Sequence, residues 1–182
     1  MTFFKENSYT VVRLGLNQFG MAIFGLVVTM ACVRITSDSE STTLVALSGL
    51  LATLMYWFLL YSVCWTEGGT HRIRVDGGRE KKMIYGGALL GLMANSVNLL
   101  LGIVYTVSYY INTTVAIDIS NVLNAVLRIF HSMYLGLLVA GNLTGPIPFL
   151  LIPVLGIGVC QISYLLGYHQ INLFSFTKKS PK

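Results

Sequence analysis

Runs of about twenty consecutive apolar residues recur along this chain, and each run is long enough for a helix to cross a lipid bilayer. A hydrocarbon core roughly 30 Å thick requires about 20 residues in a helix. Of the 182 residues, 54% are hydrophobic and only 10% are charged, whereas soluble domains carry about 25% charged residues. Because a soluble core of this size cannot hide so much apolar surface, the sequence predicts an all-α integral membrane helical bundle.

The apolar runs predict five transmembrane helices in one membrane domain, with four helices as the alternative. The expected spans are 12–34, 42–64, 83–111, 122–144 and 149–168. The fourth span is the ambiguous one, because part of it also fits a helix lying along the membrane surface. In that reading, one helical face carries four polar residues, namely Asn121, Asn124, Arg128 and His131. A surface helix there leaves four spans.

The distribution of basic residues predicts the orientation. Cytoplasmic loops of membrane proteins are enriched in Lys and Arg. The loop expected at 65–82 holds Arg72, Arg74, Arg79, Lys81 and Lys82, whereas the connections at 35–41 and 112–117 hold none. We therefore expect the protein in the cell membrane, with its N-terminus and loop 65–82 in the cytoplasm. Five spans would put the basic C-terminal tail outside, against this rule, and four would put it in the cytoplasm.

Net charge and cysteine usage exclude several classes of function. The net charge is +5, but the basic residues flank apolar runs, which indicates membrane orientation and not a nucleic-acid partner. Cys32, Cys64 and Cys160 lie in or beside apolar runs without a CxxC pattern, so neither a metal site nor a disulfide framework is expected. The glycines match no nucleotide-binding pattern, and no cofactor is expected.

Small residues at helical spacing predict close helix packing. Association of helices in lipid depends on the approach of small residues and on interhelical hydrogen bonds. Gly87 and Gly91 form a GxxxG pair, and the last span carries a similar stripe of Gly156, Cys160, Ser163 and Gly167. We interpret both as packing faces.

Polar side chains inside the spans are the candidates for binding a ligand or a partner, because they are costly to bury in lipid. A cation within a span costs roughly 3 kcal/mol on insertion scales, and no carboxylate at helical spacing offsets Arg128. We expect this arginine to reach water, lipid phosphate, an anionic ligand or a partner subunit. For the amides, the alternatives are solute binding and an interhelical hydrogen bond worth about 1 kcal/mol. The candidates are Asn95, Asn98, Asn121, Asn124, Arg128 and His131.

The charged stretch 65–82 is expected to be a cytoplasmic docking loop. It pairs an acidic residue with two glycines at Glu67 and again at Asp76. Alternation of apolar and charged residues around 73–75 favours a short strand or hairpin. A solvated connector whose charges set the topology is the alternative. The residues expected to contact a partner or lipid headgroups are Glu67, His71, Arg72, Arg74, Asp76 and Arg79.

Known catalytic patterns are absent from the sequence. There is no GxSxG, no HExxH and no pair of carboxylates at useful spacing, so we assign no catalytic residues and do not expect an enzyme. We expect a non-enzymatic membrane subunit of a transport or other membrane assembly, in contact with lipids and with another subunit or a second copy. One alternative is a self-sufficient transporter or channel for a polar or anionic solute. The other is a membrane enzyme that acts on lipid headgroups through Glu67, His71 and Arg72.

Overall fold

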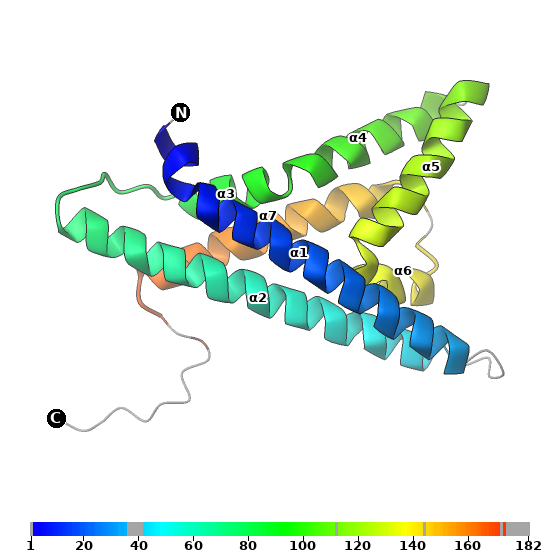
Figure 1. The fold of residues 1–182 in the computed structure, drawn as a ribbon, viewed down its shortest axis with the longest axis horizontal. Coiled ribbons are helices and arrows are strands. Elements are labelled where there is room, and N and C mark those ends of the chain that lie inside the picture. The colour runs from blue at the N-terminus through cyan, green and yellow to red at the C-terminus, as the bar shows by residue number, and fades with distance from the viewer. Residues whose placement is uncertain (1, 36–41, 112, 144, 172, 174–182) are drawn as a thin grey trace.

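The computed structural model describes residues 2–35, 42–111, 113–143, 145–171 and 173, with side chains from Asn7 onward. Every regular element in these ranges is a helix, which confirms the all-α prediction for this part of the chain (Figure 1). The elements are α1 (Thr2–Ile35), α2 (Thr43–Asp76), α3 (Gly86–Ala94), α4 (Ser96–Ile111), α5 (Thr114–Phe130), the short 3-10 helix η1 (Ser132–Tyr134), α6 (Leu135–Ala140) and α7 (Ile147–Tyr168).

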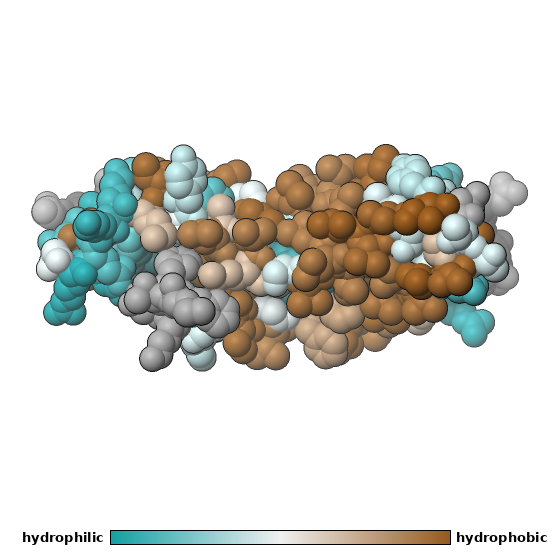
Figure 2. Space-filling model, turned by 90° about the horizontal axis from the view of Figure 1, so that it is seen from above, coloured by the Kyte–Doolittle hydropathy of each residue, from teal (hydrophilic) through white to brown (hydrophobic). Residues whose placement is uncertain are grey.

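Several of these helices are long and apolar enough to cross a membrane. Helices α1, α2 and α7 meet that condition singly. Two further pairs meet it together but are bent: α3 and α4 meet at 61°, and α5 meets η1 and α6 at 77°. The described residues thus provide three to five candidate spans. In Figure 2, hydrophobic side chains cover the middle of the visible face and hydrophilic ones gather toward its two ends, as expected for a chain placed across a bilayer.

Contacts between distant residues fix the direction of each helix. Thr10 near the start of α1 bonds Glu67 near the end of α2, so these helices are antiparallel. Gly68 of α2 packs on Tyr164 of α7, so the late parts of α2 and α7 lie together. We call this side, with residues 77–85, the first end of the bundle. The second end is where α1 finishes, α2 begins, and α5 and α6 lie (Figure 1).

Glycines allow the helices to approach very closely at the first end. A Cβ atom on Gly68 would overlap the carbonyl oxygen of Tyr164, and one on Gly167 would overlap that of Trp65. Gly87 packs against Cys160 and Tyr164, with its would-be Cβ 2.7 Å from the Cys160 carbonyl oxygen. Gly91 continues this face. The predicted packing role of the GxxxG pair and of the α7 stripe is confirmed at these positions.

At the second end, α5 and α6 fold back against the rest of the bundle. The hydroxyl of Thr53 on α2 donates to the carbonyl of Met133, 3.2 Å away, and Ser132 donates to the carbonyl of Ala22 on α1. The N-terminal half of α2 also packs on α6, because a Cβ on Gly49 would lie 2.5 Å from the Leu137 nitrogen. The bend between α5 and α6 is therefore attached to both α1 and α2.

One local prediction was wrong, and one expected span is broken. The stretch expected to be a loop with a strand-like segment is helical as far as Asp76, because Gly68, Gly69 and His71 are buried on one helical face. Only the turn that follows is irregular, with Gly78 at φ 68°, a conformation that glycine adopts without strain. The stretch 83–111, expected to be one span, remains a candidate span, but it is broken into two helices that meet at Asn95.

Candidate functional site

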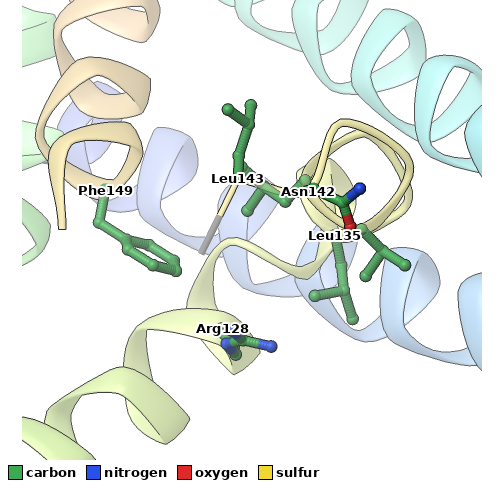
Figure 3. Close-up of a pocket in the computed structure, with 7 residues that line it drawn as sticks. Arg128, Leu135, Asn142, Leu143 and Phe149 are labelled. Carbon is green, nitrogen blue, oxygen red and sulfur yellow. The ribbon is translucent and has the colours of Figure 1, made fainter. Parts of the chain in front are cut away.

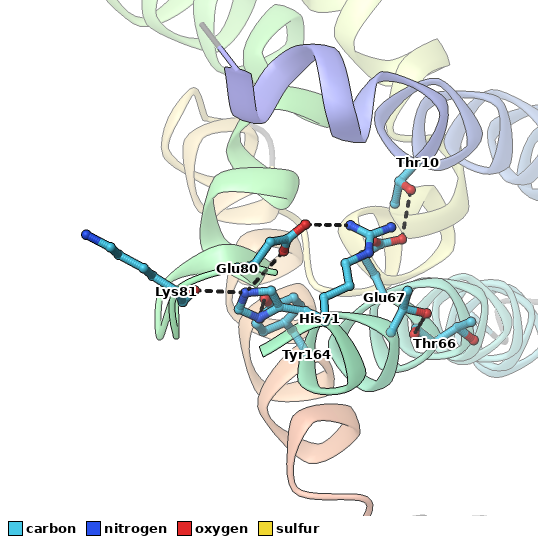
Figure 4. Close-up of polar contacts among 9 residues, drawn as sticks. Thr10, Thr66, Glu67, His71, Glu80, Lys81 and Tyr164 are labelled. Carbon is cyan, nitrogen blue, oxygen red and sulfur yellow. Dashed lines mark hydrogen bonds and ion pairs between the residues drawn. The ribbon is translucent and has the colours of Figure 1, made fainter. Parts of the chain in front are cut away.

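A polar cluster at the first end is centred on His71, whose side chain is buried. The Tyr164 hydroxyl lies 2.6 Å from Nδ1 of His71, and the Lys81 carbonyl oxygen lies 3.2 Å from Nε2. A Glu80 carboxylate oxygen lies 3.6 Å from the same Nε2. Because a carbonyl and a carboxylate both accept hydrogen bonds, the geometry fits a proton on Nε2 and a tyrosine hydroxyl that donates to Nδ1 (Figure 4).

The same cluster connects four segments of the chain. Arg74 donates to Glu80 across 3.2 Å, and Thr10 donates to Glu67 across 3.0 Å. Together with the His71–Tyr164 contact, these bonds join α1, α2, the turn after α2 and α7 (Figure 4). Polar side chains that satisfy one another in this way stabilise one arrangement of the helices.

The structure separates the residues predicted for the docking loop into two groups. Glu67, His71 and Arg74 bond other parts of the bundle. Arg72 pairs with Asp76 at 3.5 Å and donates to the Tyr168 carbonyl at 3.4 Å. Arg79 and Asp76 are exposed.

The alternative of a lipid-headgroup enzyme requires His71, Glu67 and Arg72 to face a substrate. Both ring nitrogens of His71 already have partners, and Arg72 bonds α7 instead of His71. Nor do the described residues contain a group of three or more His, Cys, Asp or Glu that could hold a metal ion.

The first helix bend, between α3 and α4, places two asparagines in the interior. Asn95 forms the break, and its side-chain amide donates to the Gly91 carbonyl at 3.0 Å. Asn98 follows one turn later and is only 4% exposed. Its amide is not among the fully buried unpaired atoms of the described residues, which are Thr29 Oγ1 and His131 Nε2. The predicted candidates Asn95 and Asn98 therefore share a buried face.

The second bend, between α5 and η1, buries His131. This side chain is 1% exposed; its Nδ1 lies 3.0 Å from the Leu127 carbonyl oxygen. Its Nε2 is buried and has no partner within the described part of the chain. Next to it, Ser132 bonds the carbonyl of Ala22 on α1, and the bend therefore sits against α1.

Gln18 is a functional candidate that sequence reasoning did not select. It lies one turn before Ala22 on α1, is 6% exposed, and bonds nothing in the described ranges. The available signal was an amide in the middle of an apolar run, which by itself does not distinguish a buried site from a lipid-facing position. We refer to Gln18, Asn98 and His131 as the interior polar set.

Phe149 at the start of α7 contacts both His131 and the helix face that carries Asn98. The His131 and Phe149 rings lie 6.1 Å apart, and Phe149 also meets Tyr105 of α4 at 5.7 Å. Tyr105 continues the buried face of α4 that begins with Asn98. His131 and the buried face of α4 thus meet at Phe149, near the start of α7.

Arg128 lies outside that set, in a pocket at the second end. Its Nε donates to Asn124 Oδ1 across 2.9 Å, as their spacing on one helical face allows. Asn121 is instead exposed in a separate crevice between α4 and α5. The Arg128 pocket has a volume of about 150 Å³ (Figure 3). Its lining residues are Arg128, Leu135, Leu138, Val139, Asn142, Leu143 and Phe149.

Comparison with known proteins identifies no relative. No family model, no curated protein and no solved structure matches this chain. The features of the chain that bear on its function are therefore the first-end cluster, the interior polar set and the Arg128 pocket.

Proposed function

We propose that this chain is a non-enzymatic membrane component of a transport assembly, which binds a small polar solute inside the helical bundle. The observation that carries this proposal is the interior polar set beside two helix bends. In this set Nε2 of His131 is buried without a partner among the described residues, and leaving such a group unpaired costs about 1–3 kcal/mol. Bent helices are tolerated in membranes where they line a cavity or are buried in protein, and transporters use broken helices to bind solutes.

The chemistry of the interior polar set favours an uncharged solute with several hydrogen-bonding groups. Gln18 and Asn98 each offer an amide that both donates and accepts, and His131 offers its Nε2. No member of the set is acidic or permanently cationic. A solute with hydroxyl or amide groups can complete these bonds, whereas a metal cation would find no carboxylate in the set.

We further propose four crossings of the cell membrane, by α1, α2, the α3–α4 pair and α7. The support is that α5 and α6 both lie at the second end, where α4 finishes and α7 begins (Figure 1). The start of α1, the turn after α2 and the end of α7 then share the first end. The same end carries the five basic residues of 65–82, so it is the proposed cytoplasmic side. Residues 174–182 lie outside the described part.

A partner subunit or a second copy, together with membrane lipids, completes the proposed assembly. Asp76 and Arg79 are exposed at the first end and are the proposed contacts for a cytoplasmic partner. Crosslinking after purification in mild detergent tests this part. We expect a species larger than the monomer, and a strict monomer without any co-purifying protein would contradict it.

Solute binding is tested by thermal unfolding of the purified protein in detergent with a panel of polyols, sugars, amino acids and nucleobases. A compound that binds only the folded state raises the melting temperature, by mass action. We expect at least one compound to raise it for the wild type and to lose that effect in Asn98→Leu. Tyr109→Phe, on the exposed face of α4, is the matched control. If no compound separates Asn98→Leu from the wild type, the proposal is wrong.

A further inference from the structure

We propose that the Arg128 pocket binds the phosphate group of an anionic phospholipid in the membrane leaflet at the second end. This site is distinct from the interior polar set, and its test does not depend on the solute. Three features of the site support this proposal: the charge of Arg128, the size of the pocket, and the exposed apolar side chains on its rim.

No carboxylate in the described part of the chain balances the charge of Arg128. Its one hydrogen bond in the described ranges runs from Nε to the neutral amide of Asn124. The Nη donors are therefore available, and a guanidinium matches the paired oxygens of a phosphate. A half-buried arginine within a membrane protein requires such an anion or access to water.

The pocket has the size and polarity expected for a headgroup. Its volume of about 150 Å³ equals that of a cavity that holds a benzene-sized molecule, so it accommodates a phosphate and part of a glycerol but not an acyl chain. In Figure 3, Arg128 lies between Phe149 on one side and Leu135 on the other. Asn142 supplies the second polar group, and the remaining walls are apolar.

Exposed apolar side chains form part of the rim of the pocket. Val139 and Leu143 line it and are 42% and 50% exposed. An acyl chain attached to a phosphate at Arg128 can lie over these two side chains, where it would bury apolar area at about 25 cal/mol per Å². A free inorganic anion would gain nothing from them, and the lipid is therefore the favoured ligand.

The test compares dioctanoyl phosphatidylglycerol, dioctanoyl phosphatidylcholine and inorganic phosphate as stabilisers of the purified protein in a nonionic detergent. We expect phosphatidylglycerol to raise the melting temperature of the wild type more than the other two. Arg128→Gln should lose at least half of that rise, and Arg128→Lys should keep part of it. Arg34→Gln removes a charge exposed at the end of α1 and serves as the matched control.

A second variant keeps the test informative if Arg128→Gln does not fold. Val139→Phe fills the pocket without changing its charge and should also reduce the effect of phosphatidylglycerol. Equal stabilisation of the wild type, Arg128→Gln and Val139→Phe would overturn the proposal. So would a rise with inorganic phosphate as large as that with phosphatidylglycerol, because this would indicate a site for soluble anions.

Discussion

The hydroxyl of Tyr164 on α7 lies 2.6 Å from Nδ1 of His71 on α2, in a buried contact between residues 93 positions apart in the sequence. The two rings are 5.8 Å apart. On the other side of His71, Nε2 faces the Lys81 carbonyl oxygen and the Glu80 carboxylate. One imidazole therefore couples the end of α2, the following turn and α7, and the stability of the first end should depend on it.

Removing the Tyr164 hydroxyl should weaken the first end measurably. Tyr164→Phe keeps the ring but leaves His71 Nδ1 without a donor. We expect the free energy of unfolding to fall by about 1 kcal/mol, and by up to about 3 kcal/mol if the buried nitrogen stays unsatisfied. Unfolding in a mixed-micelle titration measures this change. Tyr109→Phe, on the exposed face of α4, is the control, and equal stability of the two variants would contradict the role assigned to the hydroxyl.

The close contact of α2 with α7 should not tolerate even one methyl group at Gly68. A Cβ there would overlap the Tyr164 carbonyl oxygen, which is backbone and cannot move aside without displacing α7. We expect Gly68→Ala to lower the free energy of unfolding by about 1–3 kcal/mol, as overpacked cores do, and to reduce the yield of monodisperse protein. Gly158→Ala on α7 meets open space and should behave as the wild type. Size-exclusion chromatography with a thermal melt compares them.

The long helices were predictable from sequence because their cause is local. An apolar run of sufficient length needs only its own residues to form a helix in lipid, and α1, α2 and α7 follow such runs. The GxxxG pair was also informative, since close helix packing requires small residues.

The bends and the polar contacts were not predictable, because their causes lie in distant segments. Nothing local distinguishes Asn95 in a helix break from an asparagine in a continuous span. Similarly, the neighbours of His71 in sequence indicate a charged loop, because its partner Tyr164 is 93 positions away. Charge density near 65–82 indicated a loop, but burial of its glycines against α7 extends the helix to Asp76.

The fold-back of α6 onto α2 should depend on Gly49. Its added Cβ would lie 2.5 Å from the backbone nitrogen of Leu137 and 2.7 Å from Cα of Gly136. Gly49→Ala should therefore loosen α6 and speed amide hydrogen exchange at the bend, where local opening needs less free energy than global unfolding. Gly145→Ala, nearby and facing open space, is the control. Unchanged exchange around Ser132 in Gly49→Ala would show that α6 is held elsewhere.

The side of the membrane reached by the C-terminal tail decides between four and five crossings. Cys64 and Cys160 are fully buried, so Cys32→Ala should give a protein that an impermeant maleimide does not label. Single cysteines are then added in that background as Arg79→Cys at the first end, Val115→Cys at the start of α5 and Ser180→Cys in the tail.

With four crossings, positions 79 and 180 should react from the same side of the membrane and position 115 from the opposite side. The physical reason is that the chain between α4 and α7 returns to the end at which it started, so only α7 carries it back. Intact cells and inside-out vesicles supply the two accessible faces. Labelling of position 180 together with position 115 would instead require α5 and α6 to cross the bilayer as a fifth span.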